Sequence, residues 1–96
     1  MSSNTPNTSP SDTPKVRLYT TSACAYCVAA KRLLGKLGLP FDEVDLTWDH
    51  PLRERLSREN DGYSTVPMIF VEGRFIGGYR ELSALEREGG LAHLRA

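Results

Sequence analysis

The 96-residue chain lacks the features that would place it among membrane, nucleic-acid-binding or disulfide-stabilised proteins. No run approaches the roughly 18 apolar residues that a membrane-spanning helix needs. Twelve basic residues are balanced by twelve acidic ones, so there is no basic surplus of the kind that nucleic-acid binding requires. Only two cysteines are present, and a disulfide between residues so close in sequence would stabilise the fold by only about 2 kcal/mol. We therefore expect one globular domain without nucleic-acid or membrane partners.

The N-terminal segment is also poor in apolar residues. Ser, Thr, Asn and Pro dominate MSSNTPNTSPSDTP, which cannot bury enough surface to offset the entropy lost on ordering. The segment has neither the basic start and apolar stretch of a secretory signal nor the arginines of a transit peptide. We expect a disordered tail over residues 1–14, a folded domain over residues 15–96 and a cytoplasmic location.

Beyond the tail, hydrophobic residues alternate between strand and helix spacing. The patterns predict strands over residues 15–20, 41–46, 66–71 and 75–76. They predict helices over residues 25–37, 49–60 and 80–87, and a last short helix around Leu91 and Leu94. The order β-α-β-α-β-β-α indicates an α/β fold, in which helices flank both faces of a four-stranded mixed sheet.

The two cysteines, Cys24 and Cys27, fall where the first strand gives way to the first helix. Unpaired N–H groups and the helix dipole stabilise an anion there, and the pKa values of cysteines in such places fall from about 8.5 to between roughly 3.5 and 7.5. Cys27 follows one turn later and should be less exposed. This pattern predicts a redox pair in which Cys24 attacks a substrate disulfide. Cys27 or an external thiol then releases the product.

Two other interpretations of the cysteines are less favoured. A zinc site would need two more ligands, and the only histidines, His50 and His93, lie in separate polar helices. Two inert core cysteines are disfavoured because a helix start that faces solvent is not a core position. No metal site is therefore predicted from the residue pattern.

Three motifs together resemble the glutaredoxin family: CAYC after YTTSA, then Thr65-Val66-Pro67, then Gly77-Gly78. The resemblance covers residues 15–96, and Tyr26 before the second cysteine distinguishes the pattern from that of thioredoxins. It implies a thioredoxin-like fold and a glutathione-dependent thiol–disulfide oxidoreductase acting in electron transport and cell redox homeostasis. The implied partners of this monomer are glutathione and proteins that carry disulfides or bound glutathione.

The resemblance also implies the site residues. Cys24 matches the nucleophile and Cys27 the resolving cysteine. The positions expected to bind glutathione are Thr21, Tyr26, Thr65, Val66, Pro67, Gly78, Tyr79 and Arg80. Two of them, Thr21 and Arg80, depart from the family pattern.

Each implied contact has a distinct role. Tyr26 would lie beside the glutathione sulfur, and Pro67 matches a cis-proline. The backbone of Thr65-Val66 would pair antiparallel with the ligand. The turn at Gly78-Tyr79 would hold the γ-glutamyl carboxylate through helix N–H groups.

The sequence departs from the family pattern at three positions. Ala25 replaces a common proline, and members with a small residue there can share a [2Fe-2S] cluster between two subunits through their first cysteines and two glutathiones. Thr21 replaces a lysine, and Arg80 stands where an aspartate would accept from the γ-glutamyl amine, although Glu81 is placed to compensate. We expect weaker glutathione binding or preference for another low-molecular-weight thiol.

Two alternatives to the glutathione-dependent enzyme stay open. One is a glutathione-ligated [2Fe-2S] scaffold or carrier with Cys24 as a ligand. The other is a glutaredoxin-like hydrogen donor that thioredoxin reductase reduces. Trp48 has no assigned role, and we expect it to pack within its loop.

Overall fold

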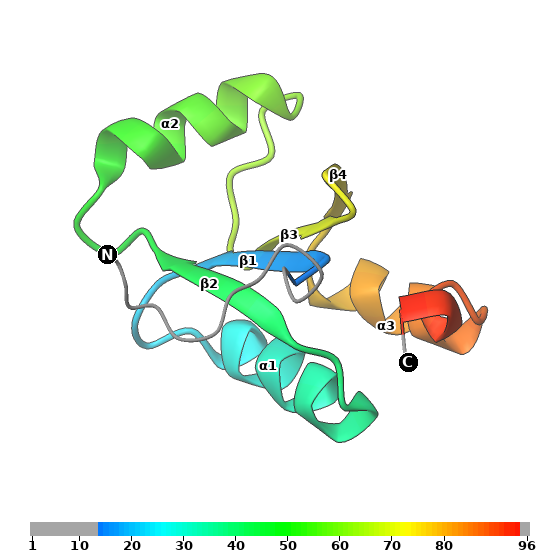
Figure 1. Cartoon of the computed structure of the whole chain (residues 1–96). Helices are drawn as coiled ribbons and strands as arrows, with labels where there is room; N and C mark the ends of the chain where they lie inside the picture. Colours follow the sequence, from blue (N-terminus) through cyan, green and yellow to red (C-terminus); the bar gives the residue numbers. More distant parts are fainter. Residues whose placement is uncertain (1–13, 95–96) are drawn as a thin grey trace, which may run out of the picture.

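A computed structural model describes residues 14–94, and the predicted tail lies outside the described residues except for Pro14. A mixed four-stranded sheet with the strand order β2-β1-β3-β4 forms the centre of the molecule (Figure 1). The strands are β1 (Val16–Thr20), β2 (Phe41–Asp45), β3 (Met68–Val71) and β4 (Arg74–Gly77). β1 and β2 are parallel, and the other two pairs are antiparallel.

Helices cover both faces of this sheet. They are α1 (Ala25–Leu37), α2 (His50–Glu59) and α3 (Tyr79–Arg87), followed by a short 3₁₀ helix (Ala92–Leu94). α1 and α3 lie on one face, and α2 lies on the other (Figure 1). The predicted α/β fold, its element order and its mixed sheet are confirmed.

The hydrophobic core is divided between the two faces. The larger cluster joins the sheet to α1 and α3, and its members are Val16, Leu18, Ala30, Leu34, Leu39, Ile69, Val71, Leu82 and Leu91. The smaller cluster lies under α2 and contains Leu46, Leu56 and Met68. Met68 and Ile69 are adjacent in β3 and both fully buried, as expected for a central strand covered on both faces.

Several element boundaries differ from the sequence prediction by one or two residues, and two of these differences have a clear physical reason. β3 begins at Met68 rather than Val66, because Pro67 has no N–H with which to join the sheet. α3 begins at Tyr79 rather than Arg80, because Gly78 serves as its N-cap and donates its N–H to the Glu81 carboxylate at 2.8 Å. The first difference leaves Thr65-Val66 outside the sheet. The second places Tyr79 in the first turn of α3.

The loop between β2 and α2 corrects another expectation. Asp49 caps α2, accepting from Leu52 N at 3.2 Å. Trp48 does not pack within the loop, because its side chain is 89% exposed. The hydrogen bonds of Thr47 and Asp49 fix the loop on either side of Trp48 and leave the indole in solvent. Among residues 14–94, no helix is long and apolar enough to span a bilayer.

Candidate active site

Cys24 is the N-cap of α1, in an extended conformation just outside the first turn. Its sulfur accepts a hydrogen bond from the Cys27 N–H at 3.1 Å, and the thiol lies 3.7 Å from the Val66 carbonyl oxygen. A backbone donor at a helix N-terminus stabilises negative charge on the group that it contacts. A thiolate at Cys24 would keep the first contact and lose the one that the S–H donates to Val66.

Cys27 is the protected sulfur of the pair. Both thiols are free, but Cys27 is only 2% exposed, whereas Cys24 is half-buried. Burial raises the pKa of the Cys27 thiol to about 12, with the hydrogen-bonded Cys24 sulfur as the next cause. Cys27 therefore holds its proton at neutral pH and Cys24 is the accessible sulfur, an asymmetry that fits the predicted roles.

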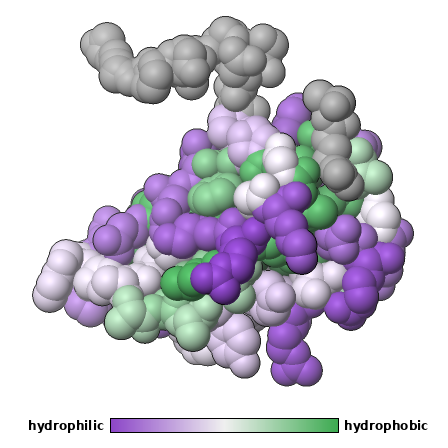
Figure 2. Space-filling view, turned by 90° about the horizontal axis from the view of Figure 1, so that it is seen from below, coloured by the Kyte–Doolittle hydropathy of each residue, from purple (hydrophilic) through white to green (hydrophobic). Residues whose placement is uncertain are grey.

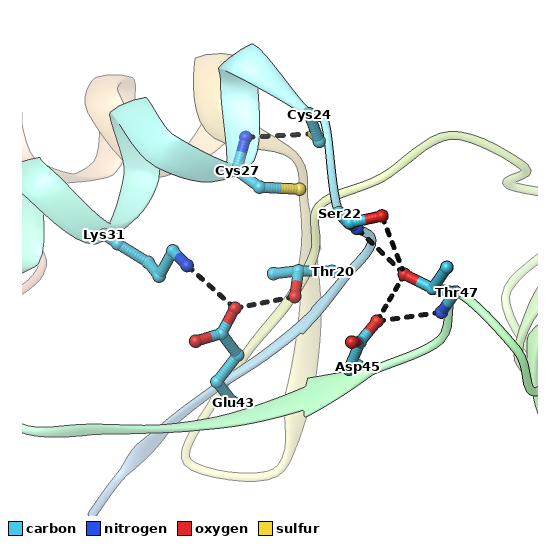
Figure 3. A network of polar contacts seen from close by, with 8 residues as sticks. All are labelled: Thr20, Ser22, Cys24, Cys27, Lys31, Glu43, Asp45 and Thr47. Carbon is cyan, nitrogen blue, oxygen red and sulfur yellow. Dashed lines mark hydrogen bonds and ion pairs between the residues drawn. The ribbon is translucent and has the colours of Figure 1, made fainter.

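A polar network lies beside Cys27, between α1 and the sheet (Figure 3). Glu43 accepts a hydrogen bond from the buried Thr20 hydroxyl at 2.7 Å and pairs with Lys31 Nζ at 2.9 Å. Lys31 and then Thr20 hold the pKa of Glu43 below its usual range, and Glu43 raises the pKa of Lys31. The charge on Lys31, one helical turn after Cys27, opposes the effect of burial on the pKa of Cys27.

A second network braces the loop that carries Cys24 (Figure 3). The Ser22 N–H donates to the Thr47 hydroxyl at 2.8 Å, and that hydroxyl donates to Asp45 at 2.6 Å. These bonds join the loop after β1 to the loop after β2. Sequence reasoning found neither network, because each joins residues from separate elements that no local pattern relates.

A hollow of about 320 Å³ lies next to Cys24, because it is lined by Val66, whose carbonyl oxygen is 3.7 Å from the Cys24 sulfur. The lining includes every predicted glutathione-binding residue except Thr21, together with Tyr63 and Glu81: Tyr26, Tyr63, Thr65, Val66, Pro67, Gly78, Tyr79, Arg80 and Glu81. The Val66–Pro67 bond is cis, as the resemblance implies. The rings of Tyr26 and Tyr79 stack with their centroids 6.2 Å apart. Tyr63 was missed, because a lone tyrosine after a helix carries no distinguishing signal.

The glycine pair shapes the hollow where it meets α3. Gly77 has a φ of +116°, and a Cβ there would lie 2.7 Å from Glu81 Cγ. A Cβ on Gly78 would lie 2.7 Å from the Tyr63 hydroxyl. A larger residue at Gly78 would therefore narrow the hollow, and one at Gly77 would displace Glu81, which lines it.

The polar groups of the hollow fit only in part the contact expected with the γ-glutamyl carboxylate of glutathione. The Gly78 N–H, one of the donors predicted for a γ-glutamyl carboxylate, already donates to Glu81. Arg80 is exposed at the rim and has no ion-pair partner among the described residues. The first N–H groups of α3 are donors available to an incoming carboxylate.

No cluster of three or more His, Cys, Asp or Glu side chains suited to a metal ion occurs within residues 14–94. His93 instead pairs with Glu72 at 3.0 Å, far along the chain from the cysteines. The zinc interpretation therefore lacks a ligand set in this part of the chain.

Comparison with known proteins places this arrangement in a family. The Glutaredoxin family model matches residues 16–76. The chain is 42% identical to a glutaredoxin of Pseudomonas aeruginosa over 78 residues, covering 81% of this chain and 92% of that protein. It is 40% identical to glutaredoxin 3 of Escherichia coli over 76 residues, covering 79% of this chain and 90% of that protein.

Solved structures agree with the sequence relatives. A dithiolic glutaredoxin from Trypanosoma brucei brucei superposes with a TM-score of 0.76 at 32% identity, covering 86% of this chain and 88% of that one. A buckwheat glutaredoxin–glutathione complex gives a TM-score of 0.78 at 25% identity, covering 85% of this chain and 76% of that one.

Proposed function

The chain belongs to the glutaredoxin family and to the general class of thiol–disulfide oxidoreductases, and we propose that it uses glutathione to reduce protein disulfides or protein–glutathione mixed disulfides. One observation carries the proposal. The accessible sulfur of the pair, at the N-terminus of α1, lies 3.7 Å from the carbonyl oxygen of Val66, and Val66 lines a hollow together with Tyr26 and Tyr79.

The proposed reaction begins at Cys24. Its thiolate attacks one sulfur of the substrate disulfide, a Cys24–substrate disulfide forms, and the other substrate sulfur leaves as a thiolate that takes a proton from water. In the dithiol route, Cys27 gives up its proton and attacks Cys24, which releases the reduced substrate and leaves a Cys24–Cys27 disulfide. Two glutathione molecules then return the pair to the dithiol and become glutathione disulfide.

A shorter route needs only Cys24. When the substrate is a protein–glutathione mixed disulfide, Cys24 takes the glutathione and frees the protein thiol. A second glutathione then attacks the Cys24–glutathione disulfide and restores the Cys24 thiolate. Cys27 is dispensable in this route.

The hollow supports glutathione as the small thiol. Its volume of about 320 Å³ is at the lower end of the range usual for small-ligand sites. Val66 lies outside the sheet and close to Cys24, so its backbone is available to a peptide-like ligand joined to that sulfur. A glutathione complex is known for the similar buckwheat protein.

A steady-state assay tests the proposal. The wild type, Cys24→Ser and Cys27→Ser are compared in the reduction of a glutathione mixed disulfide, with glutathione, glutathione reductase and NADPH. We expect turnover to vanish in Cys24→Ser and to persist in Cys27→Ser. Absence of turnover in the wild type, together with reduction of its disulfide by thioredoxin reductase, would keep the oxidoreductase class but refute glutathione as the reductant.

The [2Fe-2S] alternative stays a prediction based on Ala25. Cys27 is buried, so the described residues offer one accessible sulfur per chain, and a cluster would need a second chain and two outside thiols. Purification of the full chain under anaerobic conditions tests this. A colourless monomer is expected for the oxidoreductase, whereas visible absorbance with a dimeric elution volume would favour the cluster carrier.

The location also stays a proposal. A dithiol that must be restored by a reduced small thiol needs a reducing compartment, and the cytoplasm provides one.

A further inference from the structure

A second groove follows the seam between α1 and α3. It has a volume of about 540 Å³ and is lined by Ala29, Arg32, Leu33, Lys36 and Tyr79. Ala29, Leu33 and Tyr79 are partly buried and form an apolar floor, while Arg32 and Lys36 are exposed along the edge. The groove is thus an apolar channel with a basic rim.

This groove shares one lining residue, Tyr79, with the candidate active site. Tyr79 lines the hollow next to Cys24, the α1–α3 groove, and a third depression of about 450 Å³ along α3. Its ring also stacks on Tyr26, the residue just before Cys27. A chain attached to Cys24 can therefore pass over the two tyrosines and enter the groove.

The charges around these depressions are predominantly positive. Four exposed cations line the groove and the third depression, and none joins an ion pair among residues 14–94: Arg32, Lys36, Arg80 and Arg87. Glu81 is the one acidic residue of the two linings, and it is engaged with the Gly78 N–H. Because the whole chain is neutral, this basic surface is a local surplus.

The view from below shows the side of the molecule on which α1 and α3 lie. Hydrophobic surface is bordered by strongly hydrophilic surface there (Figure 2). An apolar strip with a charged rim is typical of surfaces that bind polypeptides.

We propose that the α1–α3 groove binds an acidic, extended segment of the protein substrate, next to the cysteine that reacts with Cys24. The proposal rests on the thiol–disulfide exchange described above, but not on the identity of the small reductant. It adds a recognition surface for the polypeptide to the hollow that takes the small thiol.

The spacing along α1 predicts where the acidic residues of the substrate lie. Arg32 and Lys36 follow Tyr26 by about 9 Å and about 15 Å along the helix axis. An extended peptide advances about 3.3 Å per residue, so its carboxylates should stand about three to five positions from the reactive cysteine.

A trapping reaction without glutathione tests this recognition. Reduced Cys27→Ser protein is mixed with one of two synthetic peptides whose single cysteine carries a 2-pyridyl disulfide. The peptides differ only in having glutamates or lysines three to five positions to either side of that cysteine. The Cys24 thiolate attacks the peptide sulfur, a Cys24–peptide disulfide forms, and the departing pyridine-2-thione reports the rate.

The acidic peptide should react about tenfold faster than the basic one at low ionic strength, and the difference should shrink with added salt. In the Arg32→Glu/Lys36→Glu background, the acidic peptide should react about tenfold more slowly, and the basic peptide should react faster than it does with the parent protein. Lys36 lies in the last turn of α1, where a positive charge stabilises the helix, so the neutral pair Arg32→Gln/Lys36→Gln is measured as well and should be intermediate.

Arg58→Glu is the matched control, because Arg58 is equally exposed but lies in α2, on the other face of the sheet. It should leave both rates unchanged. Equal rates for the two peptides, or a loss in the α1 variants that is the same for both, would overturn the proposal. Failure of the glutathione assay would be a separate result, because no glutathione enters the trapping reaction.

Discussion

Burial separates the chemistry of the two sulfurs at the N-terminal end of α1. Cys24 is half-buried at the helix start, whereas Cys27 is enclosed and its pKa is raised to about 12. Cys27 must lose its proton before it attacks the mixed disulfide, so its rate of attack depends on the groups that stabilise its thiolate. A hydrogen bond with the backbone of Thr21 and then the charge on Lys31, which pairs with Glu43, lower the pKa of Cys27.

Replacing Lys31 by Met should make Cys27 less reactive. The change removes a positive charge and leaves Glu43 without its ion pair, and both effects raise the pKa of Cys27. In the Cys24→Ser background, where Cys27 is the only thiol, alkylation by iodoacetamide at pH 8 should slow about two- to fivefold. Lys31→Arg, which keeps the charge, should react at the parent rate. Equal rates for Met and Arg at this position would show that Lys31 does not influence Cys27.

Arg80 offers a second test at a single residue. It lines the hollow where the ammonium of glutathione would lie in a family-like pose, and an arginine there only donates and repels a cation. Arg80→Asp should lower the apparent KM for glutathione by about two- to fivefold, the size of one exposed charge interaction. An unchanged KM in the glutathione assay would remove Arg80 from the account of weak binding.

The junction of β4 and α3 sets the width of the hollow. Gly78 has an extended conformation that alanine can adopt, but a Cβ there would meet the Tyr63 hydroxyl at 2.7 Å. Gly78→Ala should therefore raise the KM for glutathione several-fold, and the additional change Tyr63→Phe should restore part of the loss by removing that oxygen.

Gly35→Ala is the matched control for this steric test. Nothing lies within 4 Å of a Cβ at Gly35, and the change should stabilise α1 by about 0.5–1 kcal/mol without altering the KM. A Gly78→Ala enzyme with the parent KM would show that the glycine does not set the width of the site.

Element boundaries and core residues were predictable where neighbouring residues in the sequence determine them. The two-residue spacing in Val16 and Leu18 and the cap at Asp49 predict a buried strand face and a helix start, and both are confirmed. The start of β3 was not predicted, because the apolar run continues through Val66 while Pro67 cannot pair. The exposure of Trp48 was missed because hydrogen bonds from neighbouring residues determine the path of its loop.

The candidate site was predictable only in part for the same reason. The spacing of Cys24 and Cys27 is local and indicates a redox pair. The contact of Thr20 and Lys31 with Glu43 depends on the register of β1 against β2 and on how α1 packs over them, which the β-α-β pattern does not specify. Tyr63 lines the hollow only because the fold brings the segment after α2 next to Gly78 at the start of α3, and these two segments are not neighbours in the sequence.

At the scale of the whole molecule, the buried thiol links redox state to stability. The folded, reduced protein holds the Cys27 proton more tightly than the unfolded chain does, because burial raises the pKa of Cys27 to about 12 from an ordinary value of about 8.5. A group whose pKa is raised on folding stabilises the fold fully below its unfolded pKa and loses that contribution as the pH rises toward its folded pKa. Reduced protein should therefore lose this stabilisation across the alkaline range.

This dependence is measured as the free energy of unfolding in urea, under reducing conditions, from about pH 8 to about pH 11. The wild type should lose stability more steeply with pH than Cys27→Ala, whose other titrating groups are the same. The slope is compared rather than the absolute value, because the alanine also removes buried volume. Parallel pH profiles would contradict a raised pKa for Cys27.

In the proposed reaction, Cys24 alone forms the covalent intermediate with the substrate. The most direct measurement incubates reduced Cys27→Ser and Cys24→Ser proteins with glutathione disulfide at pH 7, stops the reaction with acid and locates bound glutathione by peptide mass mapping. We expect one glutathione on Cys24 of the Cys27→Ser protein, and no adduct on Cys27 of the Cys24→Ser protein in the same time. An adduct that forms on Cys27 as fast as on Cys24, or none on Cys24, would refute the assignment of Cys24 as the nucleophile.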